Sequence, residues 1–184
     1  GFLSNLYQKG LGEFFYVNNL DPNYRIEFPA DGNIKACNFA GEGALVALGG
    51  GKDSLVSIEI LQKAERPITT WSLGHKQQLL PLVESVGLPH IWVDRQIDPY
   101  LTTEQAPYNG HVPISAIFAG VGTIVAILNG KQDVVMSNEA SADAPTLNYR
   151  GVEINHQYSK SSDFEISYQQ LLAHCFGTSP RYFS

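Results

Sequence analysis

The sequence has 184 residues, of which 43% are hydrophobic and 16% are charged, and its formal net charge is −6. A chain of this length and composition can bury a substantial hydrophobic core as one domain. The negative charge gives no basic footprint for nucleic acid, and no apolar run reaches the ~18 residues of a membrane span, so we expect neither nucleic acid nor a membrane as a partner.

The first forty residues carry aromatic and β-branched side chains around turn signals. Segments 14–17 and 24–28 flank the polar stretch 18–23, which contains Asp21-Pro22. This pattern predicts a strand, a turn and a second strand, and the alternation of apolar and charged residues in 24–28 predicts one buried face. We therefore expect an N-terminal β-hairpin extension over residues 1–40, followed by a core domain over residues 41–184.

The core domain is organised around residues 44–61. An apolar run of strand length ends at three glycines, and after three intervening residues apolar side chains follow at helical spacing. Glycines let the backbone approach a ligand, and the N–H groups at a helix N-terminus attract anions such as phosphate. Between them, Lys52 adds positive charge, Asp53 can face a divalent cation, and Ser54 can cap the helix or bond a phosphate oxygen.

The glycine loop is not a Walker loop, because Asp53 follows Gly51-Lys52 and Val46 stands where that motif has its first glycine. The stretch instead resembles the S-G-G-x-D-S loop of the PP-loop ATP pyrophosphatases, which cleave ATP between the α- and β-phosphates. Gly49 stands where that family usually has serine, which replaces one hydroxyl by a backbone N–H. The resemblance implies ATP and Mg²⁺ as cofactors, with Asp53 as the metal ligand. The residues expected at the nucleotide are Gly49, Gly50, Gly51, Lys52, Asp53 and Ser54.

Strands and helices alternate after this loop. The patterns predict a strand at 67–73, a helix at 75–86, a strand at 89–94, a polar loop or lid at 95–110, a helix that starts within 109–113 and a strand at 133–136. The helix runs to residue 128 and is evenly apolar, which predicts that it is buried. The alternation predicts an α/β domain whose parallel sheet of about five strands carries helices on both faces. The PP-loop resemblance implies the same adenine nucleotide alpha-hydrolase-like fold.

Ligands of such sheets lie beyond the carboxyl ends of the strands. We therefore expect the glycine loop, residues 72–74 and residues 94–95 on one rim. In the PP-loop fold the end of the second strand borders the adenine, which makes Ser72 and Leu73 candidate contacts. Trp71 is a further candidate, although a core position explains it equally well.

Three motifs narrow the resemblance: Asn-Gly-His-Val-Pro at 109–113, Ser-Asn-Glu-x-Ser-Ala at 137–142 and Asn-His-Gln-Tyr-Ser-Lys-Ser at 155–161. Together they resemble the ATP-dependent epimerases that act on UDP-N-acetylmuramoyl-L-alanyl-L-glutamate, over about residues 43–176. The resemblance implies a cytoplasmic enzyme of peptidoglycan precursor synthesis that inverts the terminal L-glutamate of this nucleotide-sugar peptide and consumes ATP to AMP and pyrophosphate. Members of that family extend further at the C-terminus, so we expect this chain to be part of a longer protein.

Adenylation explains why such an inversion would use ATP. The α-proton of a carboxylate is very weakly acidic, and joining the carboxylate to AMP removes the negative charge that opposes its removal. Inversion then needs a proton to leave one face of the carbon and to return on the other. The candidates for this step are His111, His156, Tyr158 and Lys160, the last three of which would alternate along one side of an extended segment. Lys160 is also a candidate contact of the β- or γ-phosphate. Glu139 is a candidate contact of Mg²⁺ or the substrate.

Two alternatives remain at this point. Another PP-loop enzyme would amidate or thiolate its adenylated substrate, and a non-catalytic nucleotide-binding module would use the loop for binding alone. The two cysteines, Cys37 and Cys175, form neither a metal spacing nor a disulfide framework. We expect them to be buried or half-buried thiols, in keeping with a reducing cytosol.

Overall fold

The computed structural model describes residues 1–29, 36–103, 108–138 and 144–184. Its centre is a five-stranded sheet in the order β3-β2-β1-β4-β7, in which every neighbouring pair is parallel. β1 (Ala44–Ala47) lies between β2 (Ile68–Leu73) and β4 (Asp133–Val135), while β3 (His90–Val93) and β7 (Arg181–Phe183) form the edges. The predicted α/β domain with a five-stranded parallel sheet is therefore confirmed, with the strand before the glycine loop at its centre.

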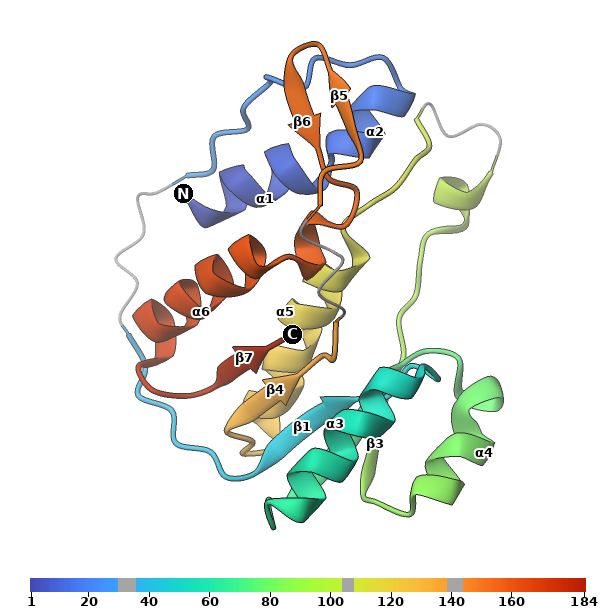
Figure 1. The fold of residues 1–184 in the computed structure, drawn as a ribbon, viewed down its shortest axis with the longest axis vertical. Helices are drawn as coiled ribbons and strands as arrows, with labels where there is room; N and C mark the ends of the chain where they lie inside the picture. Colours follow the sequence, from blue (N-terminus) through green and yellow to red (C-terminus); the bar gives the residue numbers. More distant parts are fainter. Residues whose placement is uncertain (30–35, 104–107, 139–143) are drawn as a thin grey trace.

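Helices cover both faces of the sheet, as predicted (Figure 1). On one face, Val46 and Ile68 pack with Ile58 of α3 (Lys52–Lys63) and Val83 of α4 (Lys76–Val86). On the other face, Leu45 and Trp71 pack with residues of α5 (Ile114–Leu128) and α6 (Ser162–Phe176). Neighbouring residues of β1 thus enter different halves of the core, because successive strand side chains point to opposite faces.

α5 departs from the prediction in its start and in its burial. The helix begins at Ile114, after Pro113, and its buried residues include Ala119, Gly122 and Ala126. Its outer face is exposed, with Ile117 at 44%, Ile124 at 59% and Leu128 at 78% of full exposure. Uniform hydrophobicity was thus a poor guide to uniform burial, because only one side of this helix packs against the sheet. Within the described residues, every helix is too short or too polar to span a membrane.

The predicted N-terminal hairpin is wrong. Residues 14–17 belong to α2 (Gly12–Val17), which follows α1 (Phe2–Gly10), and residues 24–28 form no strand. Phe2 of α1 packs 5.9 Å from Phe164 and 5.6 Å from Tyr168, measured between ring centroids. In α2, Phe15 is buried, and packing of this helical face outweighs the strand preference of the aromatic run.

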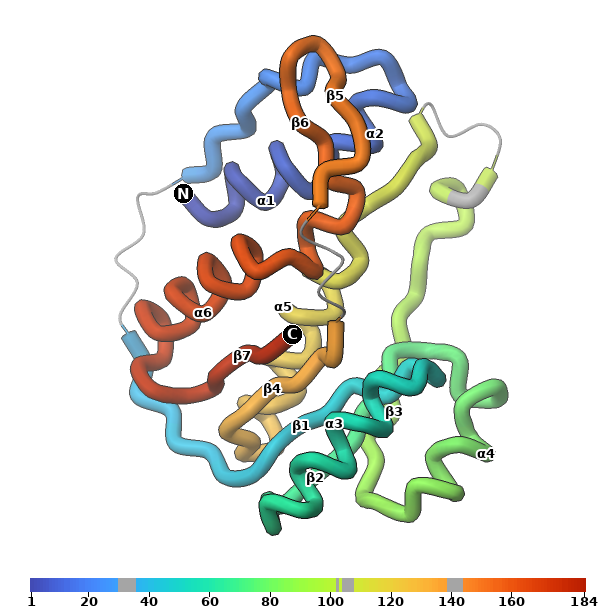
Figure 2. The backbone as a smooth tube through the Cα atoms, viewed as in Figure 1, coloured from blue at the N-terminus to red at the C-terminus, as the bar shows by residue number. Residues whose placement is uncertain are grey.

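The antiparallel hairpin lies elsewhere, in β5 (Leu147–Tyr149) and β6 (Val152–Ile154). Arg150 and Gly151 both have positive φ, which is the backbone of a tight hairpin turn. The ring of Tyr149 lies 5.3 Å from that of Tyr16, and the Arg150 guanidinium donates to Asn19 over 2.8 Å. These contacts hold the hairpin beside α2, at the top of Figures 1 and 2. No pattern in the sequence predicted this hairpin.

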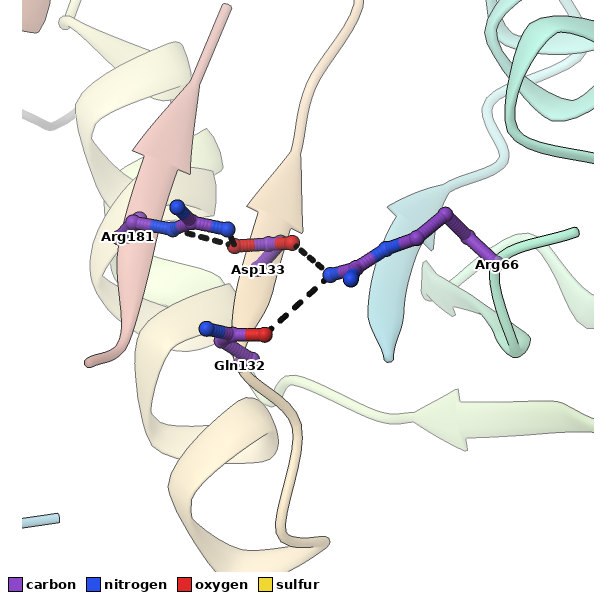
Figure 3. Close-up of polar contacts among 4 residues, drawn as sticks. All are labelled: Arg66, Gln132, Asp133 and Arg181. Carbon is purple, nitrogen blue, oxygen red and sulfur yellow. Dashed lines mark hydrogen bonds and ion pairs between the residues drawn. The ribbon is translucent and has the colours of Figure 1, made fainter. Parts of the chain in front are cut away.

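A buried carboxylate joins three segments at the amino ends of the strands (Figure 3). Asp133, the first residue of β4, accepts from Arg66 over 2.6 Å and from Nε of Arg181 over 2.8 Å. Arg66 also donates to Gln132 over 3.2 Å. Arg66 precedes β2 and Arg181 begins β7, so this cluster ties both segments to β4 at the side of the sheet opposite the glycine loop.

Candidate functional site

A cavity of about 650 Å³ opens at the carboxyl ends of the parallel strands. Its walls come from the glycine loop after β1, the end of β2, the start of α4, the first turns of α5, the end of β4 and η3 (Tyr158–Lys160). The strand order reverses between β1 and β4, so the cavity occupies the position where sheets of this kind bind ligands. The predicted residues that line it are Gly49, Gly51, Asp53, Ser54, Ser72, Leu73 and Lys160.

The glycine loop leaves room beside its backbone. A Cβ added at Gly49 or Gly51 would meet no atom within 4 Å, so packing within the described protein does not exclude a side chain there. Gly50 has φ +88°, a conformation that residues with a side chain rarely adopt. The loop is therefore shaped by one glycine and kept open by two others, which lets a ligand approach the peptide groups. Lys52 and Gly50 do not belong to the cavity lining, although both adjoin it.

Ser54 is buried and its hydroxyl donates to the carbonyl of Gly51 over 2.9 Å. It therefore does not cap α3, and no other side chain of the described residues caps this helix. The first N–H groups of α3 lack an intrahelical partner. Together with the side chain of Lys52, they make this end of the cavity favourable for an anion.

The end of β2 forms the apolar part of the wall. Ser72 is buried and donates its hydroxyl to the carbonyl of Leu48, which fixes the ends of β1 and β2 against each other. Trp71 belongs to the buried core and also lines the cavity, with its ring 6.2 Å from that of Phe118. Trp71, Leu73 and Phe118 thus form an apolar part of the cavity wall next to the polar loop.

Residues from the second and third of the sequence motifs, at 137–142 and 155–161, also line the cavity. Ser137 and Asn138 line it after β4, and Ser137 donates to Ser57 of α3 over 2.8 Å. Lys160 reaches it from the end of η3. Glu139 lies outside the described residues.

The predicted acid and base candidates separate into two places. The rings of His111 and His156 lie 6.1 Å apart between centroids. His111 precedes the first turn of α5 and His156 precedes η3, and both of those elements line the cavity. The structure thus brings together two imidazoles from distant motifs.

Tyr158 faces elsewhere, because the segment is not extended. η3 is a tight helical turn, so the predicted alternation of residues 156, 158 and 160 along one side is wrong. Tyr158 lines a second cavity of about 500 Å³ with Lys9 and Asp163, whereas Lys160 lines the first. Burial and the neighbouring Asp163 carboxylate raise the pKa of Tyr158 to about 12, so its proton is held tightly at neutral pH.

Several lining residues were not predicted. His75, with φ +55°, immediately precedes α4 and interacts with Gln78 over 3.1 Å between Nδ1 and Oε1. Ser115 and Leu79 line the wall from the first turns of α5 and α4. The one available signal was position, because Ser115 follows the 109–113 motif and His75 follows the predicted rim residues at the end of β2.

Comparison with known proteins identifies the family of the chain. Residues 1–184 match the family described as MurL N-terminal domain. The chain belongs to this family. It is 37% identical over 187 residues to the UDP-N-acetyl-alpha-D-muramoyl-L-alanyl-L-glutamate epimerase of Xanthomonas oryzae pv. oryzae, an alignment that covers 99% of the chain and 42% of that relative.

Two further relatives of the same name show similar figures. The relative from Micromonospora sp. is 37% identical over 97% of the chain and 41% of its own length. The relative from Salinispora tropica is 36% identical over 97% of the chain and 40% of its own length. The chain therefore spans about two fifths of the curated relatives that it matches.

Proposed function

We propose that this domain activates the terminal glutamate of UDP-N-acetylmuramoyl-L-alanyl-L-glutamate with ATP and takes part in its inversion to D-glutamate. One observation carries the proposal: a single cavity collects the glycine loop and Lys160, which lie in distant motifs. Relatives named as epimerases of this compound, matched along nearly the whole chain, support the choice of substrate.

The loop, in this proposal, binds the phosphates of ATP and the wall after β2 binds the base. Backbone N–H groups at the start of α3 and the charges of Lys52 and Lys160 balance the charge of the departing pyrophosphate. The apolar side chains of Trp71, Leu73 and Phe118 suit contact with a purine ring. We further propose that the domain is of the PP-loop ATP pyrophosphatase type.

The described residues fit a magnesium ion that is shared with phosphates. Asp53 supplies one carboxylate at the cavity, and no group of three metal-ligating side chains exists within the described ranges. One carboxylate plus phosphate oxygens and water is an ordinary environment for Mg²⁺. Its chemical contribution would be to neutralise phosphate charge, with Asp53 holding it against the loop.

His111 and His156 are the proposed proton carriers for inversion at the α-carbon. Neither imidazole belongs to the cavity lining, but the two rings lie 6.1 Å apart between centroids and each residue precedes an element that lines the cavity, which supports the assignment. Tyr158 instead faces the other cavity and holds its proton with a pKa of about 12. An imidazole can both accept and return a proton. Lys160 is then left to contact phosphate.

The decisive test runs in deuterated water. The chain, and in parallel the Xanthomonas oryzae relative, is incubated with ATP, Mg²⁺ and the muramoyl dipeptide, and the products are identified by mass spectrometry. We expect AMP, pyrophosphate and D-glutamate that carries deuterium at Cα. ADP and phosphate would refute the pyrophosphatase assignment. Formation of AMP and pyrophosphate by both proteins with no deuterium at Cα would refute the epimerase.

Variants separate the two steps. His111→Gln and His156→Gln should retain pyrophosphate release and lose deuterium uptake, while His174→Gln in the exposed last turn of α6 serves as control. Lys160→Met should lower pyrophosphate release, in contrast to Lys63→Met on the exposed side of α3. Label from the relative but not from this chain would show that the remaining part of such proteins supplies the proton carriers.

A further inference from the structure

The two cysteines are neighbours in the fold although they are far apart in sequence. Cys37 lies in the segment that leads into β1, and Cys175 lies in the last turn of α6. The backbone N–H of Cys37 donates to the carbonyl of Cys175 over 2.8 Å, and Phe39 makes a similar contact with Phe176 over 3.5 Å. Figure 2 shows this light-blue segment against the end of α6.

The backbone contact brings the two Cα atoms within the range of a disulfide. The bonds from one Cα to the other through the hydrogen bond total roughly 7 Å when straight, and the bond angles shorten this path. Disulfides join Cα atoms about 4.4–6.8 Å apart. Cys37 is exposed, contrary to expectation, and Cys175 is half-buried, so the thiol of Cys37 is open to a reagent while its backbone contacts that of the other cysteine.

We propose that Cys37 and Cys175 form a dithiol site, which a low-molecular-weight disulfide such as oxidised glutathione converts reversibly to an intramolecular disulfide. The thiolate of Cys37 attacks the reagent and releases one reduced thiol, which leaves a mixed disulfide on the protein. The thiolate of Cys175 then attacks the Cys37 sulfur and releases the second reduced thiol. The protein loses two electrons and two protons, and the reagent gains both.

The dithiol site lies toward the amino ends of the strands, whereas the cavity opens at their carboxyl ends. Glu42, a few residues after Cys37, donates its N–H to Gly130, and Gly130 precedes β4 at the amino ends of the strands. A disulfide there joins the segment before β1 to the helix before β7 and restricts the unfolded chain. It raises stability without touching the residues that line the cavity, so it goes beyond the proposed function and does not depend on it.

The chain itself serves for the test. After incubation with oxidised glutathione, we expect free thiols to fall from two per chain to none, and peptide mapping under non-reducing conditions to join the peptides of Cys37 and Cys175. The oxidised monomer should melt at a higher temperature than the reduced one. Cys175→Ser should instead retain one glutathione on Cys37, because no second thiol displaces it.

Three results would overturn the proposal. Wild-type chain that keeps glutathione on Cys37 would show that Cys175 does not reach it. A dimer linked through Cys37 would show that the exposed thiol pairs between copies. The wild-type chain could also keep both thiols free after prolonged exposure while the Cys175→Ser variant stays unmodified. That result would show that the site does not react.

Discussion

Replacing Asp133 by alanine should destabilise the domain more than any loss of a surface ion pair. The Asp133 side chain is 8% exposed and pairs with Arg66 over 2.6 Å and with Nη2 of Arg181 over 2.7 Å. Removing one partner of a buried ion pair costs about 3–5 kcal/mol. Arg66 and Arg181 are 37% and 45% exposed, so both can regain water and the lower value applies. A loss of about 3 kcal/mol corresponds to a fall in Tm of roughly 6–12 °C for a domain of this size.

The assay is thermal and urea unfolding of matched variants. Glu59→Ala removes an exposed i,i+4 pair with Lys63 and should cost no more than about 0.5 kcal/mol. Arg66→Ala and Arg181→Ala should each cost less than Asp133→Ala, because the carboxylate keeps one partner. In the Asp133→Ala background, either arginine change should have little further effect. An Asp133→Ala variant as stable as Glu59→Ala would refute the reasoning.

Three further predictions rest on other contacts. Gly122→Val should lower the free energy of unfolding by about 1–3 kcal/mol in urea, because an added Cβ lies 2.9 Å from Cζ2 of Trp71. Gly120→Val on the same helix is the control, since a Cβ there meets nothing within 4 Å. Equal losses of stability in the two variants would contradict this prediction. Asp53→Asn should lower the rate of pyrophosphate release far more than ATP affinity measured by calorimetry, and equal losses would argue against a metal role. The pKa of Tyr158 is near 10 in the unfolded chain and about 12 in the fold. The unfolded state therefore releases this proton first, so stability should fall as pH rises from 10 to 12, and Tyr158→Phe should flatten that fall; an unchanged slope would exclude Tyr158 as its source.

The sequence pattern predicted a helix or strand correctly where all the residues that determine the element lie in one segment. The apolar run before Gly49 and the helical spacing after Ser54 predicted β1, the loop and α3, and strand and helix alternation predicted the sheet. The same reasoning failed at residues 14–17, where burial of Phe15 and the contact of Tyr16 with Tyr149 of the β5–β6 hairpin accompany a helix. It also missed β7, because Arg181–Phe183 becomes a strand only through pairing with β4.

The candidate site was predictable in its loop and less so in its opposite wall. Gly49, Gly51, Asp53 and Ser54 form one continuous segment and meet the cavity together. Lys160 came from a motif resemblance, and its separation from Tyr158 depends on a tight turn that the sequence does not reveal. The closeness of His111 and His156 likewise depends on how two distant segments pack.

The edges of the sheet have a consequence for how copies of this domain meet. Within the described residues, β3 and β7 are the outer strands, with four and three residues. Pro89 immediately precedes β3 and Pro180 immediately precedes β7. Proline has no N–H to donate, and short edge strands offer few unpaired groups to an incoming strand. Both edges therefore oppose extension of the sheet from one molecule into the next, because each edge strand is short and directly follows a proline.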